Sequence, residues 1–504
     1  MAGTFDHGVS RRRLITGAGV LALGALTGCG VENSSSVPAD SDAVRRAEER
    51  RRRAGARVHH VDITAGMATV DLGGPLVRTW AYDDAVPGRE LRVTAGDVLR
   101  ARVRNVLPAQ TTVHWHGVAL RNDMDGVPGL TQAPIDPGGE FIYEFTVPDP
   151  GTYFFHPHVG IQTDHGLYAP LVVEDPQEPG SYDVEQLVVL DDWTDGVGED
   201  PDTILRRLLR GGHGMGGMPA MGMGGAPGPQ GAGQLFPLGR DTGDVPYPLY
   251  VANGRIPTAP DVIRARPGQR MRLRLINAGS DTAFRVGIGD HRMTVTHTDG
   301  FPVRPVDVDA PLVAMGERYD VTVTLGDGVF PLVASAEGKQ GQALLLLRTG
   351  SGAAPRSDVR PRELSGRLLR LSDLQATDDV VLPTGDPDRT LPVRLGGGMM
   401  TYRWTINGRT FDDLQPLRLR QGEWARLRFA NHTMMYHPMH LHGHTFQVLG
   451  PAGRIGPRKD TLIVLPGQTL DADLVADNPG QWATHCHNAY HMAAGMMTVL
   501  SYER

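Results

Sequence analysis

Four pairs of histidines spaced two residues apart are the groups in this 504-residue chain with the clearest capacity for chemistry. In an extended strand, residues i and i+2 project from one face roughly 6.5 Å apart, so each pair can offer two imidazoles to one metal cluster. The pairs hold 8 of the 19 histidines, which makes chance a poor explanation. Imidazole binds Cu, Zn, Fe and Ni alike, so the pairs alone do not identify the metal. They are His114 and His116, His156 and His158, His440 and His442, and His485 and His487.

Cys486 stands between the two histidines of the last pair. Successive side chains of a strand point to opposite faces, so its thiolate should face away from His485 and His487 and reach a different metal ion. A thiolate flanked in this way separates two metal sites while joining them through covalent bonds.

The residues that follow Cys486 indicate copper. His491 and Met496 lie in the same loop, and two histidines, one cysteine and a weak axial methionine make a blue-copper site. One distant histidine is still required. His437 qualifies, because Pro438 interrupts the strand alternation that would otherwise set its direction.

A ten-residue template that occurs three times indicates the elements that position these ligands. Each copy begins with Gly, alternates apolar with basic residues and closes on Asn, as in Gly96 to Asn105, Gly268 to Asn277 and Gly422 to Asn431. Such alternation is typical of a half-buried strand. The spacings of 172 and 154 residues are domain-sized and predict a triplicated domain. Short alternating strands with Pro-Gly turns predict an all-β protein of Greek-key β-sandwiches.

We expect the three domains at residues 58–176, 177–350 and 351–504. Nine residues after the template Asn come His114 in the first domain and His440 in the third, whereas the same offset in the second domain falls on Val286. The second domain is therefore expected to be a spacer without metal ligands.

The motifs HWHG, HPH, HPMHLHG and HCHNAYHMAAGM resemble those of the three-domain multicopper oxidases, which include laccases and bacterial copper-efflux oxidases, over essentially the whole chain from Val58 onward. The resemblance implies cupredoxin-like domains and four copper ions: one type 1, one type 2 and two type 3. It implies type 1 ligands His437, Cys486, His491 and Met496; type 2 ligands His114 and His440; and type 3 ligands His116, His156 and His487 on one ion and His158, His442 and His485 on the other.

The resemblance also implies an oxidase that takes single electrons from a donor at the type 1 site and reduces O2 to water at the three-copper cluster. Asp125 matches the family's acidic position after HWHG and is expected to supply protons. Two positions depart from the family. Pro157 stands where many members have Ser, and Met492 stands where the copper-efflux oxidase has Glu, so a second proton-relay carboxylate has no candidate.

A Gly- and Pro-rich insertion at residues 211–233 bears on the choice of electron donor. Thioethers select Cu(I), although low-complexity drift explains such a segment equally well. Three functions compete: a cuprous oxidase, a laccase for phenols or aromatic amines, and a copper-sequestering or electron-carrier lipoprotein without turnover. A carrier would need only the type 1 set, so eight paired histidines argue against the third. The candidate Cu(I) ligands are His213, Met215, Met218, Met221 and Met223, with Met434 and Met435 just before His437.

The net charge and the number of cysteines argue against two other classes of protein. A net charge of -7 provides no basic field that would attract nucleic acid, and two cysteines are too few for a disulfide framework. Residues 10–15 carry a twin-arginine pattern, and the following apolar stretch ends in a lipobox at Cys29. We therefore expect export to the cell envelope and a lipid anchor at Cys29 on the outer face of the cytoplasmic membrane, with residues 31–57 as a solvated tether; removal of Cys29 by ordinary signal peptidase is the alternative.

Overall fold

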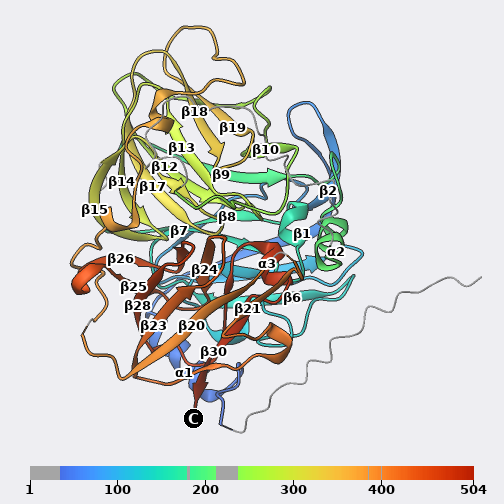
Figure 1. Ribbon diagram of the computed structural model, residues 1–504, viewed down its shortest axis with the longest axis vertical. Helices are drawn as coiled ribbons and strands as arrows, with labels where there is room; N and C mark the ends of the chain where they lie inside the picture. The colour runs from blue at the N-terminus through green and yellow to red at the C-terminus, as the bar shows by residue number, and fades with distance from the viewer. Residues whose placement is uncertain (1–34, 179–181, 212–236, 384, 399) are drawn as a thin grey trace, which may run out of the picture. The chain divides into compact units, whose positions relative to one another are not determined.

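The computed structural model describes residues 35–178, 182–211, 237–383, 385–398 and 400–504 (Figure 1). From Asn33 onward the chain forms one compact unit. Its α-helices are short, and none of the helices in the described residues is long and apolar enough to cross a membrane. The predicted export signal, Cys29, His213 and the four insertion methionines lie outside the described residues. The α-helices are α1 (Asp42–Arg51), α2 (Pro201–Leu209) and α3 (Ala489–Ala493).

Strands dominate, which confirms the expected all-β class. The first part of the chain forms two four-stranded sheets. One has the order β2 (Leu76–Tyr82), β1 (Val58–Asp71), β4 (Val98–Asn105), β6 (Glu140–Thr146), and the other has the order β3 (Leu91–Thr94), β8 (Ala169–Glu174), β7 (Gly151–His156), β5 (His114–His116).

The second part forms a six-stranded and a five-stranded sheet. The larger has the order β10 (Leu249–Ala252), β9 (Val184–Trp193), β12 (Arg270–Asn277), β17 (Arg318–Thr324), β14 (Met293–Thr298), β15 (Phe301–Val308). The smaller has the order β11 (Asp261–Arg264), β19 (Gln342–Arg348), β18 (Val329–Ala336), β13 (Phe284–Ile288), β16 (Leu312–Val313).

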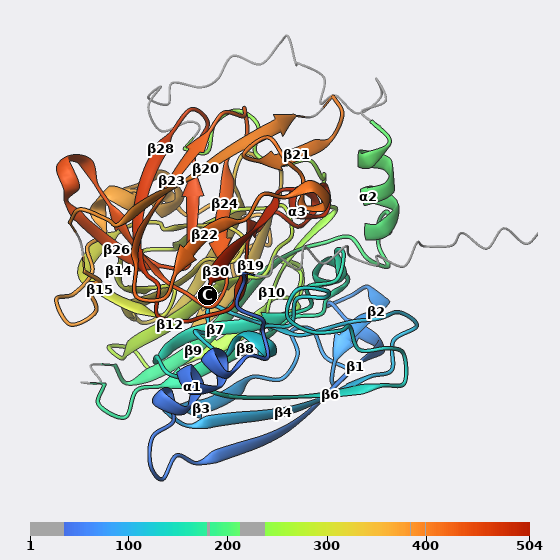
Figure 2. The same cartoon turned by 90° about the horizontal axis from the view of Figure 1, so that it is seen from below.

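The third part repeats the six-plus-five arrangement. The larger sheet has the order β21 (Arg403–Ile406), β20 (Arg389–Gly398), β23 (Trp424–Asn431), β28 (Thr469–Val475), β25 (Phe446–Leu449), β26 (Ile455–Lys459). The smaller has the order β22 (Leu417–Arg420), β30 (Met497–Glu503), β29 (Gln481–Cys486), β24 (His437–Leu441), β27 (Thr461–Val464). In Figure 2, β1 and β4 lie at one side of the view, and β20 and β23 lie at the other.

The three template strands have the same place in their sheets. β4, β12 and β23 each pair in parallel with the first strand of their domain, which is β1, β9 or β20. Each also pairs antiparallel with a later strand, which is β6, β17 or β28. The sequence repeat is therefore a structural repeat.

β12 differs from the half-buried strand that its template predicts. Its basic residues Arg272 and Arg274 are only 3% exposed, and both bind the carboxylate of Asp320. Arg274 also donates to Thr152 of the first domain at 2.8 Å. Apolar and basic residues still alternate along β12, but a neighbouring domain covers the basic face, which would otherwise be solvated. The sequence of the strand itself does not show this cover.

The segment before β1, which is expected to be a solvated tether, packs against the rest of the unit. Val37 donates to the Tyr502 carbonyl at 2.8 Å, so the chain is attached at its C-terminal strand from about residue 35. Ser41 caps α1, and Val44 is buried. Glu48 is also buried and accepts two hydrogen bonds from Thr146, each 2.7 Å long.

Candidate metal centre

Each histidine pair begins on a strand, and these strands form pairs that recur in the first and third domains. His114 and His116 both lie on β5, whereas His158, His442 and His487 lie just past the ends of their strands. β5 and β7 are antiparallel neighbours, and their register sets His114 opposite His156. β24 and β29 are paired in the same way, and His440 lies opposite His485. Rings from adjacent strands therefore start at the same level of each sheet.

The template asparagines hold the loops that lead to these strands. The side-chain amide of Asn105 donates to two main-chain carbonyls at 2.9 and 2.8 Å. Asn431 does the same at 2.7 and 2.9 Å, and Asn277 of the second domain does so at 2.9 Å to both carbonyls. The Asn that closes each template thus fixes the main chain of the loop that follows it, which in the first and third domains leads to His114 and His440.

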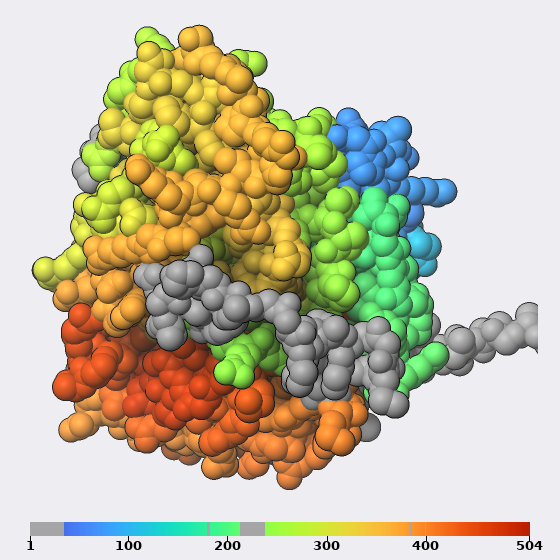
Figure 3. Space-filling view, turned by 45° about the horizontal axis from the view of Figure 1, so that its top comes forward, coloured from blue at the N-terminus to red at the C-terminus, as the bar shows by residue number. Residues whose placement is uncertain are grey.

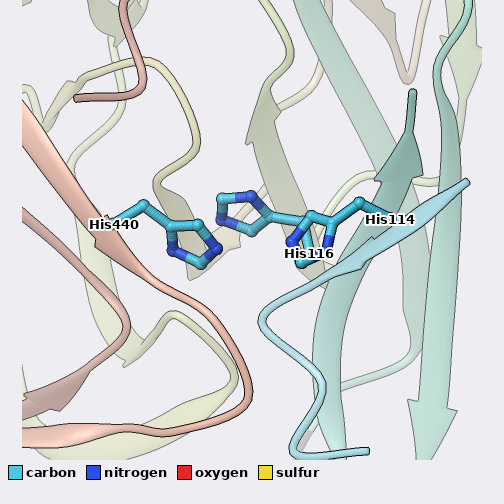
Figure 4. A group of neighbouring side chains, drawn as sticks. All are labelled: His114, His116 and His440. Carbon is cyan, nitrogen blue, oxygen red and sulfur yellow. The ribbon is translucent and has the colours of Figure 1, made fainter. Parts of the chain in front are cut away.

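Figure 4 shows His114 and His116 of the first domain pointing toward His440 of the third. In this and in two further histidine groups, one ring nitrogen from each residue lies within 4.8 Å of the others, and every member is buried. His116 belongs to two groups, so the groups are continuous across the boundary between the domains. The three groups are His114, His116 and His440; His116, His156 and His487; and His158, His442 and His485.

A fourth group contains the thiol. The Sγ atom of Cys486 lies 3.5 Å from Nδ1 of His437 and 3.7 Å from Nδ1 of His491. Met496 is fully buried, and its main chain bonds to both Cys486 and His491 at 3.0 Å. Thr433 lies 2.8 Å from Nε2 of His437, on the side of the ring away from the thiol.

Helix α3 turns the chain between the thiol group and the histidine cluster. Asn488 caps this helix, because its side-chain oxygen accepts from the main-chain N–H groups of Tyr490 and His491 at 3.1 Å. Its amide donates to Asp281 of the second domain at 2.6 Å. The cap allows His487 to face the cluster while His491, one helical turn later, faces Cys486.

The ring nitrogens of the cluster suit metal ions. Burial lowers the pKa of seven cluster histidines, so these rings are neutral and carry free lone pairs. The pKa of His485 falls to about 3, and those of His116, His156, His158, His440, His442 and His487 also fall. A buried lone pair without a partner is costly. Within the described chain, the unpartnered ring atoms of the cluster are Nε2 of His114, His156 and His440 and Nδ1 of His487.

Two buried carboxylates bond the outward nitrogens of the cluster. Asp125, the predicted proton donor, accepts from Nδ1 of His442 at 2.9 Å, and its main-chain carbonyl accepts from Nδ1 of His114 at 2.9 Å. Asp460 was not found by sequence reasoning. Its carboxylate lies 3.3 Å from both His116 and His440. Metal-binding histidines are commonly fixed in this way through the ring nitrogen that does not bind the ion.

The outer side of the thiol group contains further residues that sequence reasoning missed. The carboxylate of Asp244 accepts from Nε2 of His491 at 2.9 Å and from the Tyr402 hydroxyl at 2.7 Å. The ring of Trp404 lies 4.1 Å from that of His491. These residues come from segments far from the histidine motifs, and no spacing pattern connects them.

The two methionines before His437 have different surroundings. Met434 is 79% exposed, whereas Met435 is buried in the apolar core. A β-bridge joins Met435 to Asp241, so the stretch that follows the insertion lies on the third domain, where Figure 3 shows it in light green against red. His444, which extends the histidine alternation, bonds the Tyr502 hydroxyl at 2.7 Å, and its other ring nitrogen bonds the main-chain carbonyl of His442 at 3.1 Å.

Comparison with known proteins agrees with this arrangement. Three family models, each described as multicopper oxidase, match residues 64–178, 185–352 and 385–504. The chain is 50% identical to the multicopper oxidase MmcO of Mycobacterium tuberculosis over 99% of this chain and 98% of that protein. It is 30% identical to copper resistance protein A of Pseudomonas syringae pv. tomato, over 86% and 91%. The solved structure of a multi-copper oxidase from Pseudomonas thermotolerans is similar with a TM-score of 0.67 and 27% identity, over 89% and 100%.

Proposed function

The chain belongs to the multicopper oxidase family, and we propose that the donor it oxidises is Cu(I), which it converts to Cu(II) outside the cytoplasm. It is an oxidoreductase with O2 as acceptor and four copper ions as cofactors: one type 1, one type 2 and two type 3. When bound, these ions take single electrons from the donor and reduce O2 to water. Phenols and aromatic amines are the alternative donors.

The four structural groups support a residue-by-residue assignment of the ligands. His437, Cys486, His491 and Met496 would hold the type 1 ion, and the thiolate with two imidazoles is the donor set that suits copper. The eight paired histidines would hold the other three ions. The type 2 ligands would be His114 and His440, and the type 3 ligands would be His116, His156 and His487 with His158, His442 and His485.

Cys486 would carry electrons from the type 1 group to the cluster. Its peptide neighbours His485 and His487 belong to two different histidine groups, so the thiol is covalently connected to both. Asp125 would hold the proton that is delivered beside the cluster at its carboxylate, which bonds Nδ1 of His442. Full burial keeps bulk water away from this carboxylate and favours its neutral, proton-bearing form.

One observation carries the choice of Cu(I): the stretch that leaves the methionine-rich insertion is bonded to the proposed type 1 group. Asp244, eleven residues after the insertion, binds His491 directly, and Oδ1 of the same carboxylate is buried with no partner in the described chain. Met434 presents an exposed thioether nearby, next to the residue that bridges to Asp241. Soft thioethers capture Cu(I), and a carboxylate favours the Cu(II) product.

The proposed location follows from the N-terminal sequence. Export by the twin-arginine route and lipidation of Cys29 would place the enzyme at the outer face of the cytoplasmic membrane. A relative that carries the name of a copper resistance protein supports a role in removing Cu(I) there.

The proposal is tested by deleting residues 211–233 and measuring steady-state oxidation of Cu(I) and of a bulky phenol under the same conditions. The KM for Cu(I) should rise roughly tenfold, the effect of losing about 1.4 kcal/mol of binding. The rate with the phenol should be unchanged or higher, because a phenol does not need a thioether in order to bind. Copper content should stay at four ions per chain.

Two single substitutions sharpen this test. Met434→Leu should raise the KM for Cu(I) alone, whereas Met67→Leu, which changes a partly exposed methionine on β1, should have no effect. If neither the deletion nor Met434→Leu alters Cu(I) kinetics, the methionines are incidental and the enzyme is a laccase for phenols and aromatic amines.

A further inference from the structure

Arg318, the first residue of β17 in the second domain, joins all three domains beside the cluster. It is fully buried. Its guanidinium donates to both carboxylate oxygens of Asp460 in the third domain, at 2.7 and 2.6 Å. Nε donates to the Thr152 carbonyl of the first domain at 3.0 Å. The planar fork of an arginine matches a carboxylate in this two-point geometry and fixes its orientation as well as its charge.

Asp460 lies against two cluster histidines. One of its carboxylate oxygens lies 3.3 Å from Nε2 of His116 and 3.3 Å from Nδ1 of His440. The Thr461 hydroxyl donates to the same carboxylate oxygen at 2.8 Å and lies 3.3 and 3.1 Å from these two nitrogens, and the Asp460 main-chain carbonyl lies 3.0 Å from Nδ1 of His440. These are the outward nitrogens of the two rings. The inward ones are Nδ1 of His116, which lies 3.2 Å from His487, and Nε2 of His440, which has no partner in the described chain.

Two glycines make the close approach possible. Gly117 has a φ of +85°, and a Cβ there would lie 2.4 Å from Arg318 and 2.7 Å from Asp460. Gly316 of the second domain has a φ of +81°, and a Cβ there would lie 2.7 Å from His487 and 2.9 Å from His116. The guanidinium therefore lies against Gly117, the neighbour of His116, and Gly316 lies against His116 and His487, at points where only glycine fits.

The main chain that carries Asp460 is held by the same domain. Asp299 accepts from the main-chain N–H groups of Arg318 at 3.0 Å and of Thr461 at 3.1 Å. Lys459 is buried, and its ammonium group lies 3.1 Å from the carboxylates of both Asp299 and Glu317. Asp460 thus has its side chain and its neighbours fixed by residues of the second domain.

We propose that Arg318 is a positioning residue for the copper cluster, which orients His116 and His440 through Asp460. The second domain, which supplies no ligand in this assignment, then helps to position the cluster ligands and is not only a spacer. This inference rests on the proposed assignment of His116 as a type 3 ligand and His440 as a type 2 ligand.

The test is a chelator titration of the copper-loaded enzyme, read by the electron paramagnetic resonance signal of the type 2 ion and by the blue absorption of the type 1 ion. In Arg318→Gln, the type 2 signal should be lost at a chelator concentration roughly 10–100-fold lower than in the wild type, the usual cost of removing a group that orients a metal ligand. The blue absorption should be unchanged, because Cys486 and its partners do not contact Arg318.

Arg272→Gln is the matched control. Arg272 is also buried in the second domain and also bonds a carboxylate, that of Asp320, but within the described chain its carboxylate partners bond none of the cluster histidines. Arg272→Gln should lose the type 2 signal at the same chelator concentration as the wild type. This should hold even if its thermal midpoint falls as far as that of Arg318→Gln. Arg318→Lys keeps the charge without the two-point geometry and should be intermediate.

Two outcomes would overturn the inference: Arg318→Gln with wild-type resistance to the chelator, or Arg272→Gln with the same loss as Arg318→Gln. If Arg318→Gln does not fold, Arg318→Lys decides, and wild-type resistance in that variant counts against the proposal. A wild-type enzyme without a type 2 signal would instead contradict the ligand assignment on which the inference rests.

Discussion

Asp125 and Asp460 are two halves of one arrangement with different electrostatic surroundings. Each is fully buried, and the carboxylate of each lies within 3.3 Å of a ring nitrogen of one histidine of the first domain and one of the third. Asp460 has a bidentate partner in Arg318. Asp125 forms an ion pair with no lysine or arginine among the described residues, and one of its oxygens has no hydrogen-bond partner there.

The difference sets the protonation of the two groups. Burial raises the pKa of Asp125, and nearby histidines offset this only in part. Burial also acts to raise the pKa of Asp460, but the charge and hydrogen bonds of Arg318 outweigh it and hold that pKa well below its usual range. The two carboxylates have similar positions, so the difference between them comes from one buried cation. Arg318 keeps Asp460 as a fixed negative charge, whereas Asp125 has no such partner and can exchange a proton.

The largest effect is expected from Asp460→Asn, which leaves Arg318 as a buried cation without its main partner. The free energy of unfolding should fall by about 3–5 kcal/mol, and the cluster should release copper to a chelator roughly 10–100-fold more readily. Calorimetry and copper analysis measure the two losses.

Asp473→Asn is the control for that prediction, because Asp473 is also buried and accepts two bonds from Arg426 in the same domain. It should lose stability but keep its copper. If both variants retain copper equally well, Asp460 has no special connection to the cluster.

A smaller and more selective effect is expected from Asp125→Asn. Removing the proton-bearing carboxylate should slow reoxidation of the reduced enzyme by O2 roughly 100-fold, since general acid–base groups typically contribute at least this much. Reduction of the type 1 site by the donor consumes no proton there and should be unaffected. Stopped-flow spectroscopy separates the two half-reactions, and equal reoxidation rates in variant and wild type would contradict the proton-relay role.

The smallest effect concerns pH and the copper-free protein. A carboxyl with a raised pKa, such as Asp125, stabilises the fold at low pH, and this stability is lost as the pH rises above about 3.9, the usual aspartate value, toward the raised value. Asp460, with a lowered pKa, contributes stability above about pH 3.9 that is lost as the pH falls below it. From pH 4 to 7, the thermal midpoint of Asp125→Asn should therefore rise relative to that of the wild type, while that of Asp460→Asn should stay below the wild type by a constant amount. As the pH falls below about 3.9, the difference between Asp460→Asn and the wild type should shrink. If both variants show the same pH dependence relative to the wild type, the two carboxylates are electrostatically alike.

The sequence predicted the features that depend on local periodicity. Residues two apart on a strand share a face, so the H-x-H pairs predict histidines that gather together and a Cys486 that points the other way. The structure brings the eight paired histidines into three buried groups and Cys486 into a fourth. The triplicated template located β4, β12 and β23 and the all-β class for the same reason. Asn105 and Asn431 stand out in the sequence as template positions, but only the structure shows that their side chains hold the loops that lead to the ligands.

Only the tertiary structure revealed the residues whose partners are far away in the sequence. Arg318 is 142 residues from Asp460, Asp244 is 247 residues from His491, and neither has a spacing that refers to its partner. The exposure of a strand's second face, as in β12, was likewise undetermined until a neighbouring domain covered it. The physical reason is that alternation along a strand is set by bond geometry within a few residues, whereas contacts between domains depend on how three separately folded sheet pairs come together.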